Sequence, residues 1–175
     1  MQNKFLTFFT FFLLLFLLSL SSITVFAFSL NCTTTRILDG DTFHCLPATA
    51  ISNAKTHKDG TITIRMRGID APEKRQPYGI ESQKSLKELI GRKTVKLEIK
   101  NIDRYGRVVA YVFIGNININ LEQVKRGYAW AYAEYLDRPY ASEFYDAEKQ
   151  ARKQKLGLWQ QLNPTSPWEW RKKNR

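Results

Sequence analysis

Thr61-Ile62-Thr63-Ile64-Arg65-Met66-Arg67 is the stretch that decides the fold of this chain. Its apolar residues, Ile62, Ile64 and Met66, take every second position, and polar residues occupy the positions between them. Because successive side chains of a β-strand point to opposite faces, this alternation predicts a strand with one buried face. The other face carries threonines and arginines, which is a first indication of a polar site beside the strand.

Further strand and helix signals lie on both sides of this stretch. Runs of β-favouring residues bounded by turn residues predict four more strands, over Thr33 to Leu38, Thr42 to Leu46, Thr94 to Ile99 and Val108 to Ile114. Apolar residues at helical spacing predict three helices, over Glu81 to Ile90, Ile119 to Arg126 and Pro139 to Leu156. The inward stripes expected for the first and last helices include Ile80 and Leu156.

The order of these elements is three strands, a helix, two strands and two helices. Five strands with an interposed helix fit an α+β fold: a five-stranded Greek-key barrel of the oligonucleotide-binding (OB) type with three α-helices. An open mixed sheet is the alternative.

The N-terminal segment has the order of a secretory signal. Lys4 precedes an uncharged apolar centre, and Val25-Phe26-Ala27 suits a cleavage point. We therefore expect a signal peptide at residues 1–27, a secreted or periplasmic protein, and no stable membrane association after cleavage. An uncleaved anchor is the alternative, since Phe5 to Leu30 is long enough to span a bilayer.

The rest of the chain divides by composition. Residues 28–162 have the size of one ordinary domain, and residues 163–175 form a basic tail that contains tryptophan and proline. This tail either packs its tryptophans on the barrel or ends the chain as a disordered segment. The formal net charge of +11 indicates a polyanionic partner such as nucleic acid, although basic residues also serve solubility.

The chain has two cysteines, Cys32 and Cys45. An even number in an exported protein favours a disulfide. The cysteines flank Asp39-Gly40, where a hairpin turn would make them face each other directly. Directly opposite, non-hydrogen-bonded residues lie about 4.5 Å apart at Cα, which a disulfide accepts. Two free buried thiols are the alternative.

Acidic residues come in two close pairs, Asp39 with Asp41 and Asp70 with Glu73. Each pair alone is weak evidence, because Asp-Gly-Asp is usually a plain turn and lacks the ligand loop of an EF-hand. Two nearby arginines, Arg65 and Arg107, strengthen the pattern. Carboxylates that hold a hard cation, together with arginines that grip phosphate oxygens, are what phosphodiester cleavage requires.

Other functions are weaker interpretations of the same residues. His44 and His57 are the only histidines and show no ligand spacing, so a Ser-His-Asp or Cys-His arrangement is not indicated. A non-catalytic nucleic-acid-binding barrel would not need the acids and arginines together. An adhesion protein that binds anionic surfaces through the basic tail would not need the acids at all.

Three blocks in the expected order resemble the staphylococcal nuclease (thermonuclease) family. They are Ile37-Leu38-Asp39-Gly40-Asp41-Thr42, Ile64-Arg65-Met66-Arg67-Gly68-Ile69-Asp70-Ala71-Pro72-Glu73 and Asp103-Arg104-Tyr105-Gly106-Arg107. The segment from Ala151 to Trp159 is also similar to the last helix of that family. The resemblance covers about Thr35 to Trp159 and implies an OB barrel with three helices, one Ca²⁺ ion, and hydrolysis of DNA and RNA to 3′-phosphate ends. We expect a monomer.

The resemblance also implies a metal site. Asp41 and Asp70 match the calcium carboxylates, Ala71 would supply a backbone carbonyl, and Asp39 would lie behind them. Ala71 stands where the type member of the family has a threonine, a change that a backbone ligand tolerates. With four carboxylates, two Mg²⁺ ions in place of one Ca²⁺ are the alternative from the residues alone.

The remaining site residues follow by the same resemblance. Glu73 matches the acid that orients or deprotonates the attacking water, and Arg65 and Arg107 match the two arginines that grip phosphate. Arg104 and Tyr105 match residues beside the nucleotide.

The base-pocket aromatics align less cleanly with the family. Tyr135 is the best match and Tyr132 a weaker one. Trp130 is at least as well explained as a core aromatic under the last helix.

Overall fold

The computed structural model describes residues 29–174. The expected signal peptide at residues 1–27, and its alternative as an anchor, therefore lie outside the described residues. Within the described range, no helix is both long and apolar enough to cross a membrane.

Eight strands and four α-helices make up the described part of the chain. The strands are β1 (Ser29–Ile37), β2 (Thr42–Pro47), β3 (Ile62–Met66), β4 (Ile69–Asp70), β5 (Thr94–Ile102), β6 (Val108–Ile114), β7 (Ile117–Asn118) and β8 (Trp130–Ala131). The α-helices are α2 (Gly79–Ile90), α3 (Ile119–Lys125), α4 (Arg138–Lys153) and α5 (Pro167–Lys173). Two short 3₁₀ helices are η1 (Ala133–Tyr135) and η2 (Gly157–Gln160).

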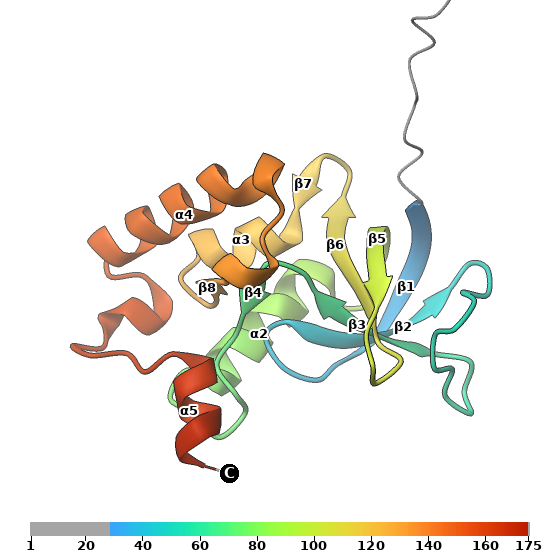
Figure 1. Cartoon of the computed structure of the whole chain (residues 1–175), viewed down its shortest axis with the longest axis horizontal. Coiled ribbons are helices and arrows are strands. Elements are labelled where there is room, and N and C mark those ends of the chain that lie inside the picture. Colours follow the sequence, from blue (N-terminus) through green and yellow to red (C-terminus); the bar gives the residue numbers. More distant parts are fainter. Residues whose placement is uncertain (1–28, 175) are drawn as a thin grey trace, which may run out of the picture.

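Five of these strands close into a barrel (Figure 1). The strands β3, β2, β1, β5 and β6 are neighbours in that order, and each of these pairs is antiparallel. The barrel closes where β3 pairs with β6 in parallel. This closure confirms the predicted barrel and excludes the open mixed sheet. The helices α3 and α4 lie together on one side of the barrel (Figure 1).

The strand β3 has the alternation that its sequence predicts. Ile62, Ile64 and Met66 are at most 1% exposed, whereas Thr63 and Arg65 between them are partly exposed. Other strands and α4 add large apolar side chains to the same core, among them Phe43, Leu97, Val108, Val112 and Phe144. Burying one such side chain stabilises the fold by about 1.5–3 kcal/mol, so this core dominates the stability of the barrel.

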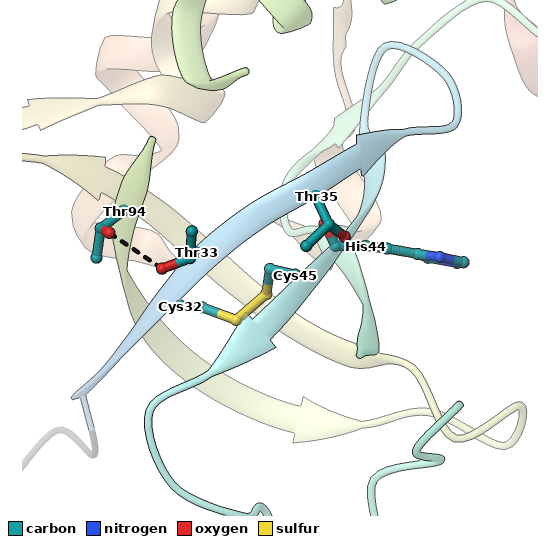
Figure 2. Close-up of a disulfide and its surroundings, with 6 residues drawn as sticks. All are labelled: Cys32, Thr33, Thr35, His44, Cys45 and Thr94. Carbon is teal, nitrogen blue, oxygen red and sulfur yellow. Dashed lines mark hydrogen bonds between the residues drawn. A yellow bond between two sulfur atoms is a disulfide. The ribbon is translucent and has the colours of Figure 1, made fainter. Parts of the chain in front are cut away.

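The predicted disulfide between Cys32 and Cys45 joins β1 to β2 (Figure 2). The Cα atoms are 5.7 Å apart, but the two residues are not directly opposite, so that part of the prediction is wrong. Cys32 pairs with Pro47 and Cys45 with Thr34, because the hairpin turns later than expected and the register shifts between Thr34 and Arg36. The offset of two residues keeps both cysteines on the same face, where they are buried.

The three predicted helices are present, with two corrections to their inward faces. Ile80 is 40% exposed and Leu156 is 37% exposed. Leu156 lies beyond the last residue of α4 and so does not share its inward stripe. The buried face of α2 contains Ser82, Ser85 and Leu86, since small polar side chains let the helix approach the barrel closely.

The C-terminal tail forms a fourth helix, α5, and packs against the domain. Ser166 and Pro167 are buried, and the Trp168 ring stacks on Tyr132 with centroids 5.2 Å apart and planes 5° from parallel. The same ring meets Trp130 edge-on at 5.5 Å. Of the two expectations for the tail, the one in which a tryptophan packs is correct, although Trp168 packs on the segment after α3 rather than on the barrel itself.

Candidate active site

Three short segments meet at one end of the barrel. The β2–β3 register pairs Thr42 with Arg65, so Asp41, the residue before Thr42, lies next to the Arg65 side chain. After β3 the chain turns at Gly68, whose φ of 75° is in the left-handed region that favours glycine. This turn brings Asp70 of β4 back to the same guanidinium.

The Arg65 guanidinium bridges the two acids. Its Nη1 contacts the carboxylate of Asp41, and its Nη2 donates to Oδ1 of Asp70 at 2.8 Å. The side chains of Asp41 and Asp70 are 5% and 1% exposed, and that of Arg65 is 18% exposed. Burial lowers the pKa of Arg65, and the negative charge of Asp70 opposes this shift. An arginine remains protonated under such conditions, so the three residues form a buried ion cluster.

Hydrogen bonds fix the orientation of Asp41. The Thr42 hydroxyl donates to Oδ1 at 2.8 Å, and the Ala71 N–H donates to Oδ2 at 2.7 Å. The Asp41 N–H in turn donates to Oδ1 of Asp39 at 3.0 Å. Burial raises the pKa of Asp39, and the positive charge of Arg65 opposes the shift. Asp39 and Ala71 therefore lie beside Asp41, and Ala71 contacts it through its N–H.

Glycine is required at the centre of the turn before β2. A Cβ atom on Gly40 would lie 1.7 Å from Oγ of Ser82. The amide of Gln123 donates to the Gly40 carbonyl at 2.8 Å, and the Ser82 hydroxyl donates to the Tyr128 carbonyl at 2.6 Å. The helices α2 and α3 thus hold the turn that carries the first acid.

Glu73 lies on the segment between β4 and α2. Its N–H donates to Oε1 of Gln76 at 3.1 Å, and Nε2 of Gln76 donates to the Thr165 carbonyl at 2.7 Å. The Glu73 side chain is 39% exposed, whereas Gln76 is buried. The acid is therefore open to solvent, while its backbone is tied to the C-terminal segment.

A third arginine, Arg171 of α5, contacts this cluster. It donates to Oδ2 of Asp70 at 2.7 Å and to Oε1 of Glu73 at 2.8 Å. Sequence reasoning missed this residue, and also Gln76. Arg171 is 101 residues away from Asp70 in the chain. It lies in a run of three basic residues, and no sequence signal sets it apart from the other two. The tryptophans before it are the one signal that the tail docks on the domain.

Arg107 lies close to the cluster without contacting it. It precedes β6, which pairs with β3. Burial raises the pKa of Asp39 and lowers that of Arg65; the charge of Arg107 opposes the first shift and adds to the second. Its Nε donates to Oδ2 of Asp103 at 2.7 Å, and its N–H donates to Oδ1 at 3.0 Å. The turn Asp103–Arg107 is thus held in shape by its own aspartate.

The expected nucleotide-contacting residues lie in two exposed places. Tyr105 is 60% exposed, and the Arg104 guanidinium donates to its hydroxyl at 2.8 Å. Tyr135 is 45% exposed, and its ring centroid is 5.0 Å from that of Tyr132. Trp130 packs edge-on against Trp159, with ring centroids 4.4 Å apart, consistent with a packing role under α4.

The donor atoms of this cluster fit a hard divalent cation. Asp41, Asp70 and Glu73 offer oxygen only, which is the ligand type that Ca²⁺ and Mg²⁺ prefer. Among residues 29–174, however, no three His, Cys, Asp or Glu side chains converge as a ready ligand set, and arginines join the acids instead. Forked guanidinium groups beside them suit the oxygens of a phosphate.

Comparison with known proteins assigns the chain to a family. The family described as Staphylococcal nuclease homologue matches residues 63–161. An uncharacterized endonuclease of Haemophilus influenzae is 40% identical over 144 residues, which cover 82% of this chain and 74% of the relative. A micrococcal nuclease of Shigella flexneri is 38% identical, with 78% of each chain covered.

A plant relative shares a smaller part of its length. The probable staphylococcal-like nuclease CAN2 of Oryza sativa subsp. japonica is 45% identical over 112 residues, which are 64% of this chain and 30% of the plant protein. The family match over residues 63–161 contains Arg65, Asp70, Glu73 and Arg107 of the site, whereas Asp41 and Arg171 lie outside the matched range. On the family match and the bacterial relatives together, this chain belongs to the family of staphylococcal nuclease homologues.

Proposed function

We propose that this protein is an exported, calcium-dependent nuclease that hydrolyses the phosphodiester bonds of DNA and RNA. The observation that carries the proposal is the cluster in which Arg65 bridges the buried carboxylates of Asp41 and Asp70. Burying charged groups is costly unless they are paired and hydrogen-bonded, and a protein that only binds nucleic acid has no need of such a cluster. The names of the bacterial relatives, an endonuclease and a micrococcal nuclease, support the same activity.

The acids of the cluster are the proposed metal site. Asp41, Asp70 and the carbonyl of Ala71 are the groups that would hold the ion, and Asp39 orients the backbone of Asp41 from behind. When bound, Ca²⁺ supplies Lewis-acid polarisation of the phosphoryl group. The choice of one Ca²⁺ over two Mg²⁺ ions rests on the family resemblance.

The arginines and Glu73 perform the remaining chemistry. Arg65 and Arg107 grip the phosphoryl oxygens and neutralise the charge that develops on them. The ion pair with Asp103 uses Nε of Arg107, whereas a forked contact with phosphate would use the two Nη groups of the same side chain. Glu73, at the solvent edge, orients the attacking water and accepts its proton.

The proposed reaction leaves the phosphate on the 3′-oxygen. The water oxygen bonds to phosphorus, the bond from phosphorus to the 5′-oxygen breaks, and that oxygen takes up a proton from solvent. The exposed residues Arg104, Tyr105 and Tyr135 are proposed to contact the nucleotides on either side.

A digestion experiment tests the proposal. Purified protein is incubated with plasmid DNA and with RNA in Ca²⁺, in Mg²⁺ or in EDTA, and the product ends are identified by phosphatase sensitivity and mass. We expect cleavage of both substrates in Ca²⁺, 3′-phosphate ends, and none in EDTA. Binding without cleavage in every metal would leave only a nucleic-acid-binding barrel, and cleavage in Mg²⁺ alone would replace the calcium assignment.

Export and a monomeric state are part of the same proposal. The disulfide between Cys32 and Cys45 supports an oxidising compartment, where such bonds persist. N-terminal sequencing of the protein recovered outside the cytoplasm should begin at Phe28. An N-terminus at Met1 in a membrane fraction would instead support the anchor. Light scattering of the purified protein should give the mass of one chain.

A further inference from the structure

Arg171 of the C-terminal helix α5 contacts the acidic cluster. Its Nη2 donates to Oδ2 of Asp70 at 2.7 Å, and its Nη1 donates to Oδ1 of Asp70 at 3.2 Å and to Oε1 of Glu73 at 2.8 Å. Oδ1 of Asp70 also accepts from Arg65. Both oxygens of a carboxylate that is 1% exposed are therefore engaged by guanidinium groups.

The helix that carries Arg171 is docked on the domain at further points. Thr165 accepts a hydrogen bond from the buried Gln76, and Trp168 stacks on Tyr132 and meets Trp130 edge-on. Trp130 pairs with Asp70 in the β4–β8 ladder, so this contact lies beside the acid itself. In Figure 1, α5 lies alongside the segment between β4 and α2. The contact of Arg171 is thus part of a defined interface.

This interface places the guanidinium cation of Arg171 where the proposed function requires a divalent metal ion. A divalent ion bound by Asp70 must use oxygens that Arg171 now engages, and bidentate arginine–carboxylate pairs are among the stronger hydrogen-bonded contacts. An arginine side chain stays protonated in proteins, so Arg171 is a permanent cation at this place. Two ligands that use the same atoms oppose each other's binding by equal factors.

Resting on the proposed metal-dependent function, we propose that Arg171 sets the metal affinity of the site. It is an internal cation that competes with the divalent ion for Asp70 and Glu73, and its helix leaves the cluster when the ion binds. Arg65 contacts Asp70 at Oδ1, whereas Arg171 engages both Oδ1 and Oδ2 and comes from a docked seven-residue helix. Arg171 is therefore an affinity-determining residue that acts through the acids.

The amide of Gln76 links this movement to Glu73. The Gln76 side chain both accepts a hydrogen bond from the Glu73 N–H and donates one to the Thr165 carbonyl. When the C-terminal segment leaves, Gln76 loses one of these partners and the Glu73 carboxylate loses its arginine. Metal binding then also releases Glu73 to contact water.

Calorimetric titration of Ca²⁺ into metal-free protein tests the competition directly. We expect Arg171→Gln to bind Ca²⁺ more tightly than the wild type, by roughly 5- to 150-fold, the usual range of coupling between linked sites. Arg171→Lys keeps the charge without the fork and should fall between the two. Lys172→Gln is the matched control, because it removes one charge from an exposed position of the same helix and should leave the affinity unchanged.

A second measurement follows the helix itself. Hydrogen exchange of residues 167–173 in the wild type should become faster when Ca²⁺ saturates the protein, whereas exchange in β3 should not. Unfolding curves of each variant check that the fold is retained. Equal Ca²⁺ affinities in the wild type and Arg171→Gln, or unchanged protection of α5, would overturn the inference.

The outcomes also separate this inference from the proposed function. Wild-type protein that binds Ca²⁺ and cleaves DNA, with an affinity that Arg171→Gln does not change, would sink the competition alone. A variant with unchanged Ca²⁺ affinity and a raised KM for DNA would make Arg171 a phosphate-binding residue instead. Failure of every variant to bind any divalent ion would remove both the calcium assignment and the competition.

Discussion

Asp70 is held by two arginines that come from very different parts of the molecule. Arg65 projects from a barrel strand, and its side chain is 18% exposed. Arg171 projects from the last helix, and its side chain is 38% exposed. The first contact forms between residues five positions apart, and the second between residues 101 positions apart. The same carboxylate therefore has one partner that belongs to the barrel and one that belongs to a helix docked on it.

The largest effect should come from removing the fixed partner. Arg65→Ala leaves the buried Asp41 and Asp70 without their shared cation, which should cost about 3–5 kcal/mol of folding stability. By analogy with the arginine fingers of phosphoryl-transfer enzymes, it should also lower kcat/KM for DNA by roughly three to five decades. Denaturant unfolding and DNA digestion measure the two effects. If Arg171→Gln destabilised the fold as much, the contrast between the two arginines would be lost.

Arg107→Ala should separate chemistry from stability. Its ion pair with Asp103 joins side chains that are 33% and 19% exposed, and such pairs contribute about 0.2–1 kcal/mol. The loss in kcat/KM should nevertheless be roughly three to five decades. Near-wild-type turnover of a folded Arg107→Ala protein would remove this residue from the site.

The disulfide should stabilise the barrel without affecting the metal site. Replacing Cys32 and Cys45 together by serine removes a disulfide between residues 13 positions apart. This should lower the free energy of unfolding by roughly 2–4 kcal/mol. The Ca²⁺ affinity at 25 °C should not change, because neither cysteine contacts the cluster. A parallel loss of affinity would mean that the acids depend on the β1–β2 hairpin.

The smallest effect concerns an ion pair that fixes α4 to the barrel. Arg67 donates to Oδ1 of Asp137 at 2.7 and 3.1 Å. Partial burial acts to raise the pKa of Asp137, but the hydrogen bonds and charge of Arg67 outweigh it, so the pKa is lowered from 3.8. The stabilisation is present above pH 3.8 and is lost as the pH falls through the lower folded value.

Asp137→Asn should therefore cost about 1.5 kcal/mol near neutral pH and less in acid. Melting temperatures of both proteins between pH 2 and 6 should converge at the acid end. Saturating Ca²⁺ should leave the difference between them unchanged, because this pair is not the one that we propose the metal displaces. Curves that stay parallel down to pH 2 would contradict the lowered pKa.

The sequence predicts those parts of the molecule that depend on nearby residues. The period of two in β3 places Arg65 on a polar face, and Asp70 follows one turn later, so their proximity is a local property. The direct opposition of the cysteines was wrong because the hairpin turns later than expected. The register shift between Thr34 and Arg36 reduces the resulting offset to two residues, and neither feature leaves a mark in the sequence. The contact of Arg171 with Asp70 depends on how a distant helix docks, and no local pattern encodes it.

The parallel pairing of β3 with β6 has a consequence for folding kinetics. It brings Arg107, which directly precedes β6, to the seam with the strand of Arg65 that closes the barrel. Among the described barrel strands, the pairing of β1 with β5 also joins segments that are far apart in the chain. Contacts between residues far apart in the chain form late, because the loop between them must first be closed. In a refolding experiment, cleavage activity should therefore return with the slowest kinetic phase, after most of the spectroscopic signal of the β-strands. The return of activity would then mark the closing of the barrel.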